Sequence, residues 1–508
     1  MRNILSARRP AARAFALVLA ASLAALACLP GCATAPASGR VGPGALSGPL
    51  ATGPFPSPSE LSPFAREGLS SLSTFELSNG IPVVLRQNGA SPVRHLSLVL
   101  RGGSLAAEPA TAGFELLAMR TMARGSKGYS YEDITSLLDE TSAAMGAAAA
   151  FEYSTYSLTA LDKHFARLLP VWADTLAAPR FSEEDFAQVL SEAKLALKSR
   201  EQDPWQRTGL VMNAEFFAGH PYAASPDGTK ESLAAASLQA AKDWYAKSFS
   251  ADRIFVVAVG DFDAEELKAG LEKALGALPD RKAGLPAPAP AFAAAGEGRL
   301  VKSEHAQSKG VGYLRGDFAA PPPSDPSYMA ANVAMKMFSD LPFNVVRDEH
   351  GAAYSPSAYV RGFGANYGSV AVFKTTKAAE VKAYIDEAAA ELAAGRCLSV
   401  DPARSEGGKP RMPLAEALPA YKAQFANDYY EKLQTNAAVA GLIAQSVATT
   451  GDCRSWLLDG ARIAAVGPED VARAFKAVLD SRVTWVVLGS KDVIEPVDPA
   501  AFGKLGPQ

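Results

Sequence analysis

The chain has 508 residues, 48% of them hydrophobic, and a formal net charge of −3. This length supports more than one domain core, and the hydrophobic content excludes an intrinsically disordered chain. The slightly acidic balance gives no sign of nucleic-acid binding, which depends on clustered basic residues.

The N-terminus has the pattern of a bacterial secretion signal. Basic residues begin the chain, the apolar run "AFALVLAASLAALA" follows, and "LPGC" ends at Cys32. The apolar run is shorter than the roughly 20 residues of a membrane-spanning helix. "LPGC" resembles the lipobox of bacterial lipoproteins, which implies that residues 1–31 are a signal peptide and that Cys32 carries lipid. An ordinary cleaved signal with an incidental cysteine is the alternative.

The lipobox resemblance also implies a location. A lipid-anchored protein of the bacterial cell envelope is expected, and Ala33 in place of an aspartate after the cysteine favours the outer membrane, facing the periplasm. Pro, Gly, Ser and Ala dominate the stretch that follows Cys32. Residues 32–70 are therefore predicted to be a flexible tether.

Residues 71–281 are predicted to form the first of two domains. Asn79-Gly80 separates two alternating apolar runs in "TFELSNGIPVVLRQ", which is typical of a hairpin, and "HLSLVLRGG" follows as a third strand. A short amphipathic helix is expected over 112–126. Two strands in "SAAMGAAAAFEYSTYSLTAL", three helices between about 161 and 217 and a buried strand in "RIFVVAVGDF" complete the domain.

The second half of the chain repeats the first. Residues 282–299, rich in Pro and Ala, are predicted to be a linker, and residues 300–497 a second domain. "GVGYLRGDF" is similar to "LSLVLRGGS", and the helix-turn-strand "PEDVARAFKAVLDSRVTWVVLGSKD" is similar to "LQAAKDWYAKSFSADRIFVVAVGDFD". The expected fold class is α+β, with two homologous domains that each pack helices on one face of a sheet.

Two cysteines lie outside the signal region, Cys397 and Cys453. In an oxidising compartment an even pair is compatible with a disulfide, and two buried free thiols are the alternative. The sequence does not decide between them, because bridging depends on the separation of the two Cα atoms.

Six segments together resemble the insulinase-type zinc peptidases, family M16, over nearly the whole chain after the signal. In order they are "LSNGIPVVL", "VLRGGSLAAEP", "GFELLAMRTMARGS", "HPYAASPDGT", "VVAVGDFD" and "VVRDEHGAAYSPSAYV". The resemblance implies two M16-type domains that form a clamshell around a chamber for unfolded peptides.

In that family a helix reading G-x-x-H-x-x-E-H-x-x-x-x-G-[ST] holds zinc through two histidines one turn apart, and its glutamate is the general base. This chain aligns without a gap and places Leu116, Met119 and Arg120 at those three positions. Leucine has no lone pair, methionine has no basic oxygen, and arginine carries a permanent positive charge. The resemblance therefore implies a degenerate zinc site, with no metal or other cofactor bound by this chain.

A further family ligand, a glutamate on a later helix, falls near Ala196. Glu192 lies one turn earlier, so a small change of register would restore one carboxylate, which alone would not hold zinc.

No displaced metal or hydrolase site is evident from the sequence. No two of the five histidines have the i, i+3 or i+4 spacing of a helical metal site, and each is predicted to be a surface or packing residue. They are His95, His164, His220, His305 and His350. No "GxSxG" elbow follows a strand, which argues against a serine hydrolase.

The segment "RDEHGAAY" keeps a second family feature. Arg347 lies seven residues before Tyr354, with Gly351 as the expected turn between a helix end and a strand. The residue types alone favour a surface arginine paired with Asp348 or Glu349 and a core tyrosine. The resemblance implies instead an Arg/Tyr pair that binds the substrate backbone and the developing oxyanion.

Some bacterial members of the family are heterodimers in which one subunit carries zinc and the other the Arg/Tyr pair. The resemblance thus implies a non-catalytic subunit that completes the site of a zinc-bearing HxxEH partner for peptide hydrolysis. A peptide-binding or scaffold lipoprotein of the outer membrane is the main alternative, and an active zinc metalloendopeptidase a distant one.

Overall fold

A computed structural model describes residues 48–51, 53–280, 282–400 and 410–506. The expected signal peptide, Cys32 and the first part of the tether lie outside these residues. Among the helices of the described ranges, none is long and apolar enough to cross a membrane.

Six strands of the first half form one mixed sheet in the order β1-β2-β6-β3-β5-β4. They are β1 (Leu72–Glu76), β2 (Pro82–Gln87), β3 (Val93–Arg101), β4 (Ala144–Ala149), β5 (Tyr153–Leu161) and β6 (Ile254–Gly260). β2 and β6 pair in parallel, and all other neighbours are antiparallel. The predicted turn at Asn79-Gly80 is confirmed, since Gly80 has a φ of 81° that favours glycine.

The helices of the first half follow the expected order. They are α2 (Phe114–Met122), α3 (Tyr131–Thr141), α4 (Asp162–Ala177), α5 (Glu183–Gln202), α6 (Pro204–Phe216), α7 (Lys230–Ala235), α8 (Leu238–Ser248) and α9 (Ala264–Leu275). Polar side chains fix several starts: Ser130, Ser182 and Asp203 each accept a hydrogen bond from a backbone N–H in the first turn of α3, α5 and α6.

The second half repeats this sheet without the first strand. Its strands are β7 (Arg299–Glu304), β8 (Gly312–Ala319), β9 (Ala353–Val360), β10 (Tyr367–Thr375) and β13 (Thr484–Gly489). The order β7-β13-β8-β10-β9 matches β2-β6-β3-β5-β4, and the β7/β13 pair is parallel like β2/β6. The predicted duplication is therefore confirmed strand by strand, and β4 and β9 are equivalent edge strands.

The second sheet carries α10 (Tyr328–Pro342), α11 (Val381–Ala393), α12 (Leu414–Glu431), α14 (Asp459–Ala465), α15 (Pro468–Asp480) and α16 (Lys491–Ile494). A short ladder of β11 (Arg396–Leu398) and β12 (Arg411–Pro413) lies beside them.

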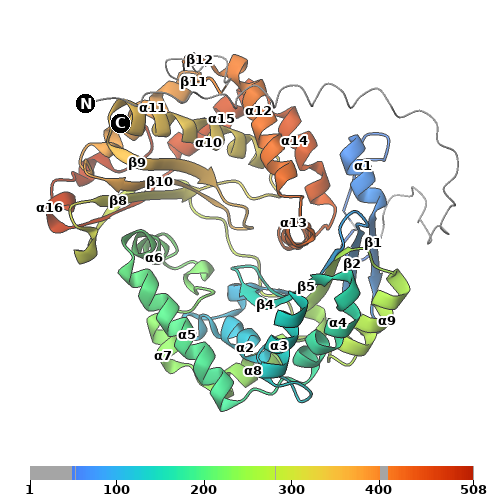
Figure 1. Cartoon of the computed structure of the whole chain (residues 1–508). Helices are drawn as coiled ribbons and strands as arrows, with labels where there is room; N and C mark the ends of the chain where they lie inside the picture. The colour runs from blue at the N-terminus through green and yellow to red at the C-terminus, as the bar shows by residue number, and fades with distance from the viewer. Residues whose placement is uncertain (1–47, 52, 281, 401–409, 507–508) are drawn as a thin grey trace, which may run out of the picture. The chain divides into compact units, whose positions relative to one another are not determined.

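Each half also lends one helix to the sheet of the other half (Figure 1). α13 (Asn436–Thr450) packs against β3 and β6, and its Ile443 and Ala444 join a core cluster with Val99 and Val257. In the opposite direction, α6 packs against β8 and β13. The two halves are thus joined by buried apolar surface as well as by the linker.

The predicted boundaries need correction at both ends. The tether prediction is wrong for its last part, because α1 (Pro63–Ser70) is a helix whose Ala65 and Leu69 are buried against Trp456 and Leu457. Ser62 caps this helix and Pro63 begins it, so a Pro/Ser-rich composition marked a helix start here. At the other end the second core extends past residue 497 to Phe502 and Leu505.

The predicted linker is held against both halves. Phe292 stacks on His220 with a ring-centroid distance of 4.1 Å and also contacts Tyr367 of the second sheet. Gly284 donates a backbone hydrogen bond to Asp252 at 2.7 Å.

The two cysteines are not bridged. Cys397 lies in the core of the second half and Cys453 in the cluster under α13, and both are free and buried. The structure therefore agrees with the alternative of two buried free thiols. Burial raises the pKa of each thiol to about 12.

Candidate functional site

The helix α2 is held in place by its packing against the first core. Phe114, Leu117 and Thr121 are buried, and the hydroxyl of Thr121 donates to the carbonyl of Leu117 at 2.7 Å. The start of the helix is fixed by a close approach, because a Cβ on Gly113 would lie 2.6 Å from the Cα of Gly228. Gly113 has a φ of 79°, so glycine is favoured there for two reasons.

An ion pair joins the turn after α2 to the first turn of α5. Asp185, which is buried, accepts from Arg124 at 3.2 Å and from Arg180 at 2.7 Å. These contacts fix the register of the two helices that would carry a family zinc site.

The three positions of the HxxEH motif have different environments. Met119 is fully buried in the first core, Leu116 is buried at its edge, and Arg120 is exposed. A cavity of about 140 Å³ is lined by Leu116 and Arg120 together with Ala196. The structure therefore brings the aligned ligand positions of α2 and α5 to one place.

The same cavity shows which residue of α5 faces the aligned ligand positions of α2. Ala196 lines it, whereas Glu192 is exposed and accepts a hydrogen bond from Gln188 one turn earlier at 2.7 Å. Glu192 does not restore a ligand.

Two charged residues that the sequence reasoning did not single out complete the cavity. Arg200 of α5 donates to Asp227 at 2.6 Å, and both line the cavity. Asp227 belongs to "HPYAASPDGT", one of the six segments that carry the family resemblance. The donor set of this cavity does not fit zinc, since its one carboxylate is paired and its other members are apolar or cationic. Within the described residues, no group of three or more His, Cys, Asp or Glu side chains is placed to hold a metal.

A buried ion pair lies beneath α2. The carboxylate of Glu115 lies 3.6 Å from the Arg253 guanidinium and accepts a hydrogen bond from Ser154. Burial raises the pKa of Glu115, and the nearby guanidinium opposes this effect. Arg253 also donates to the carbonyl of Arg101 at the end of β3, so the group ties α2 to the sheet.

Arg347 and Tyr354 lie side by side in the second half. Arg347 is in a π-helical segment, Phe343–Glu349, and Gly351, with a φ of 55°, forms the turn before β9. The guanidinium carbon lies 5.1 Å from the centroid of the Tyr354 ring. Tyr354 is 65% exposed and so is not a core tyrosine.

Arg347 lies over the Phe343 ring at 4.7 Å, but the neighbouring acidic residues give it no close ion pair. Asp348 is 3.9 Å from Arg347, at the limit of an ion pair, and Glu349 pairs instead with Arg411 at 2.5 Å. Tyr354 makes no side-chain hydrogen bond within the described ranges.

Both equivalent edge strands are open to pairing. β4 pairs only with β5, and β9 only with β10, among the described strands. β4 reads "AMGAAA", and its residues alternate between exposed and half-buried. Such an edge presents unpaired backbone N–H and C=O groups to which an extended peptide can add as a strand.

Four of the histidines have packing or hydrogen-bonding roles. His95 is buried on β3 against the Thr159 hydroxyl at 2.8 Å, and burial lowers the pKa of this imidazole to about 4. His220 donates to the carbonyl of Pro290 in the linker, and His305 to the carbonyl of Glu201. His350 stacks on Tyr384 at 3.8 Å.

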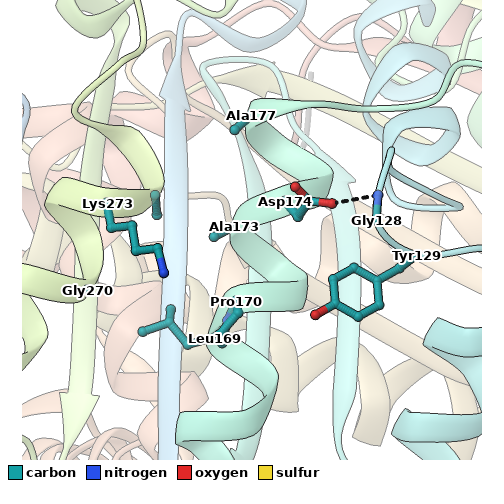
Figure 2. Close-up of a pocket in the computed structure, with 10 residues that line it drawn as sticks. Gly128, Tyr129, Leu169, Pro170, Ala173, Asp174, Ala177, Gly270 and Lys273 are labelled. Atoms are coloured by element: carbon teal, nitrogen blue, oxygen red, sulfur yellow. Dashed lines mark hydrogen bonds between the residues drawn. The ribbon is translucent and has the colours of Figure 1, made fainter.

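A larger cavity of about 460 Å³ lies between α4, α9 and the loop after α2 (Figure 2). Apolar residues of α4 line it, with Tyr129 and Lys273 at its sides, and the carboxylate of Asp174 accepts from the backbone N–H of Gly128 at 3.1 Å. It contains none of the predicted site residues.

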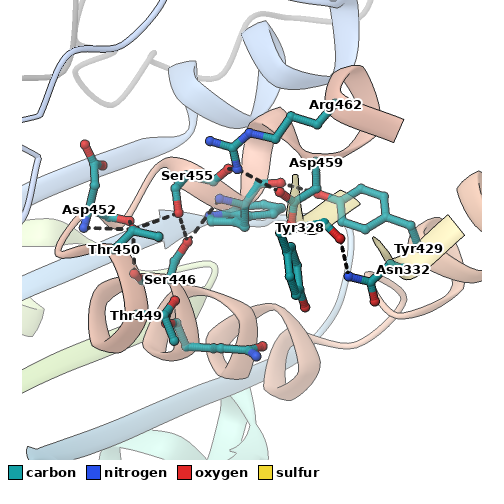
Figure 3. Close-up of polar contacts among 12 residues, drawn as sticks. Tyr328, Asn332, Tyr429, Ser446, Thr449, Thr450, Asp452, Ser455, Asp459 and Arg462 are labelled. Carbon is teal, nitrogen blue, oxygen red and sulfur yellow. Dashed lines mark hydrogen bonds and ion pairs between the residues drawn. The ribbon is translucent and has the colours of Figure 1, made fainter. Parts of the chain in front are cut away.

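A polar cluster around Asp459 lies in the second half (Figure 3). Asp459 pairs with Arg462 at 3.1 Å, and burial raises the pKa of this carboxyl to about 6. Ser455 lies 2.6 Å from the hydroxyl of Ser446 and 3.0 Å from that of Thr450. This cluster joins α13 to α14 and is separate from Arg347 and Tyr354.

Comparisons with known proteins agree with the fold. The family model described as Insulinase (Peptidase family M16) matches residues 82–226, and the one described as Peptidase M16 inactive domain matches residues 235–397. The chain is 26% identical over 203 residues to the non-peptidase homologue YmxG of Helicobacter pylori, an alignment that covers 40% of this chain and 47% of that protein. The chain thus matches about half the length of that relative.

A second relative is an uncharacterised zinc protease of Streptomyces coelicolor, 25% identical over 396 residues that cover 76% of this chain and 83% of that protein. Among solved structures, the peptidase M16 inactive domain of Pseudomonas fluorescens matches with a TM-score of 0.69 at 18% identity, covering 83% of this chain and 98% of that one. A protease from Helicobacter pylori matches with a TM-score of 0.70 at 15% identity, covering 82% and 99%. At these identities the structural matches show the fold alone.

Proposed function

Because the chain belongs to the insulinase family, peptidase family M16, as a non-catalytic member without the HxxEH motif, we propose that it is the substrate-binding subunit of an envelope metallopeptidase. Its partner is a zinc-bearing M16 subunit with an intact HxxEH helix, and the pair hydrolyses unfolded peptides. This chain supplies Arg347 and Tyr354 to the partner's active site.

The observation that carries this proposal is that the exposed Tyr354 lies beside the half-buried Arg347. An exposed tyrosine hydroxyl next to a guanidinium that its acidic neighbours give no close ion pair contributes little to folding, yet it offers two kinds of donor to a ligand. Both residues flank the start of an edge strand, where an extended peptide backbone can pair.

The two side chains have distinct roles. Zinc in the partner would supply Lewis-acid activation of water. The Tyr354 hydroxyl donates a hydrogen bond to the oxyanion that develops on the attacked carbonyl, and Arg347 donates two parallel hydrogen bonds to the peptide.

The test uses this chain mixed with its zinc-bearing partner. Tyr354→Phe is expected to lower peptide turnover by about 100- to 1000-fold, because it removes one oxyanion donor with little change in packing. Arg347→Ala is expected to weaken peptide capture as well. Tyr430→Phe and Arg473→Ala are matched controls, since both residues are exposed and lie on other helices of the second half.

Complex formation and melting temperature are measured separately from turnover. Normal turnover with both site variants would reject the complementation role and favour a peptide-binding scaffold of the outer membrane without proteolysis. If turnover is lost only in variants that also unfold, Arg347 and Tyr354 have a structural role instead.

The proposal also places the protein on the membrane through Cys32, outside the described residues. Cys32→Ser is expected to release it from the outer membrane by removing the attachment point of the lipid. Fractionation of cells that express the variant measures this, and continued membrane association with unchanged processing would point to another anchor.

A further inference from the structure

We propose that the degenerate zinc cavity has become a binding site for the C-terminal carboxylate of a peptide, with Arg120 as its principal donor. The inference rests on the proposed function, since it names the part of a peptide ligand that this chain recognises.

The first argument is charge. The ionisable side chains that line the cavity are Arg120, Arg200 and Asp227. Asp227 is held by Arg200 at 2.6 Å, so one positive charge remains unbalanced. Arg120 has no hydrogen bond or ion pair with any residue of the described ranges, although it sits at the second histidine position of the motif. A fixed cation thus stands where the family has a metal cation, and an anion is the group that it attracts.

The second argument is size and lining. The cavity has a volume of about 140 Å³, and Leu116, Leu117, Ala193, Ala196 and Leu197 make most of its wall. This space suits a carboxylate and one small apolar side chain. A planar guanidinium binds a carboxylate through two parallel hydrogen bonds, which a lysine at the same position cannot reproduce.

The third argument is position relative to the open edge of the first sheet. Met145 of β4 packs against the same core cluster as Met119 of α2, and the two elements are in contact. A second, larger cavity of about 550 Å³ is lined by Ala149 and Ala150 at the end of β4. It shares Leu197, Arg200 and Asp227 with the degenerate zinc cavity, so the two cavities lie on either side of a common wall.

A peptide added in parallel to β4 therefore ends on the side of Ala149, next to the shared wall. Backbone pairing along β4 supplies affinity without sequence preference, and capture of the terminal carboxylate fixes the register of the peptide.

The experiment measures binding of fluorescent apolar hexapeptides to the purified protein. One peptide ends in alanine with a free carboxylate, the second is the same peptide amidated, and the third is amidated and ends in glutamate. The free acid is expected to bind at least about tenfold more tightly than its amide, which is the usual scale for a hydrogen bond to a charged group. The glutamate peptide is expected to bind like the amide.

Arg120→Gln is expected to abolish the difference between acid and amide, and Arg120→Lys to retain part of it. Arg167→Gln is the matched control, because Arg167 is exposed on α4 and pairs with the exposed Glu140. The Arg167→Gln variant loses one positive charge, as Arg120→Gln does, but should keep the full difference in affinity between the acid and the amide.

Equal binding of acid and amide, persistence of the difference in Arg120→Gln, or binding of neither peptide would overturn this proposal. Tight binding of the glutamate peptide would show that an acidic side chain, not the chain end, is the ligand. A failure of the proposed function would appear in a different experiment, as normal turnover of the complex that carries Tyr354→Phe. The peptide-binding experiment measures the preference for a free carboxylate separately.

Discussion

At the scale of single residues, Asp459 of the second half is a carboxylate whose surroundings oppose its charge. It begins α14, pairs with Arg462, and shares a small polar cavity with Tyr328 and the hydroxyls of Ser446 and Ser455. Burial raises the pKa of the carboxyl from an ordinary 3.8 to about 6. Between these two values the folded state binds a proton that the unfolded state does not.

The free energy of unfolding is therefore expected to fall as pH rises from about 4 to 6, because a raised pKa in the folded state destabilises it once the carboxyl ionises. Asp459→Asn stays neutral, so it should be more stable than the wild type by about 1–2 kcal/mol at pH 7 and nearly equal at pH 4. Urea unfolding across this range measures the effect. Asp139→Asn, at an exposed position on α3, is the control, and parallel pH profiles for wild type and Asp459→Asn would contradict the expectation.

At the scale of elements, α2 keeps its packing although it lacks the residues that bind zinc in the family. Gly113, the buried residues of its inner face and the Arg124–Asp185 pair hold it in place. Met119 fills the core at the position of the general base. The position of the general base, Met119, is therefore part of the apolar core.

Met119→Glu is accordingly expected to lower the free energy of unfolding by about 3 kcal/mol or more, because it places an unpaired carboxyl in an apolar core. Met119→Leu, which conserves volume, is the control and should lower it by less than about 1.5 kcal/mol. Chemical denaturation measures both. A stable Met119→Glu variant would show that this position still opens to solvent or to a cation.

The sequence predicted most elements well, for physical reasons that α2 and the strands illustrate. Periodicity and the Asn79-Gly80 turn are local signals, so the strand pairs β1/β2 and β4/β5 and the inner face of α2 could be identified without the structure. The family resemblance also pointed to Leu116, Arg120 and the neighbourhood of Ala196, and the structure places these residues around one cavity.

What the sequence did not reveal depends on contacts between distant segments. The exchange of α6 and α13 between the two sheets, the fold of α1 onto Trp456 and the Arg200–Asp227 pair join residues far apart in the chain. The π-helical segment that brings Arg347 to Tyr354 likewise has no local sequence signal, although the family resemblance named both residues.

At the scale of the whole molecule, the two halves are joined by a buried polar contact besides the exchanged helices. Glu152, in the turn between β4 and β5, accepts from the Tyr222 hydroxyl at 2.6 Å and from the backbone N–H of Gly364 at 2.7 Å. Burial raises the pKa of Glu152, and these donors oppose the effect. Aromatic rings surround the contact, since Phe151 stacks on Tyr222 and meets Phe363 edge to face.

Glu152→Ala is expected to lower the free energy of unfolding by about 1–3 kcal/mol, since it leaves the Tyr222 hydroxyl and the Gly364 N–H without this acceptor. Cleavage in the linker, which contacts the same aromatic cluster through Phe292, should become faster. Thermal unfolding and limited proteolysis measure the two effects. Glu140→Ala is the control, as that exposed residue pairs with Arg167 of the same half. Unchanged proteolysis and stability would show that the contact does not hold the halves together.

The most direct test of the central claim is peptide turnover by three samples at equal zinc: this chain alone, the zinc-bearing partner alone, and the two mixed. The proposal predicts turnover in the mixture at least about 100-fold above either subunit, because Tyr354 and the partner's metal act on one peptide. Turnover by this chain alone, or by the partner alone at the rate of the mixture, would contradict it.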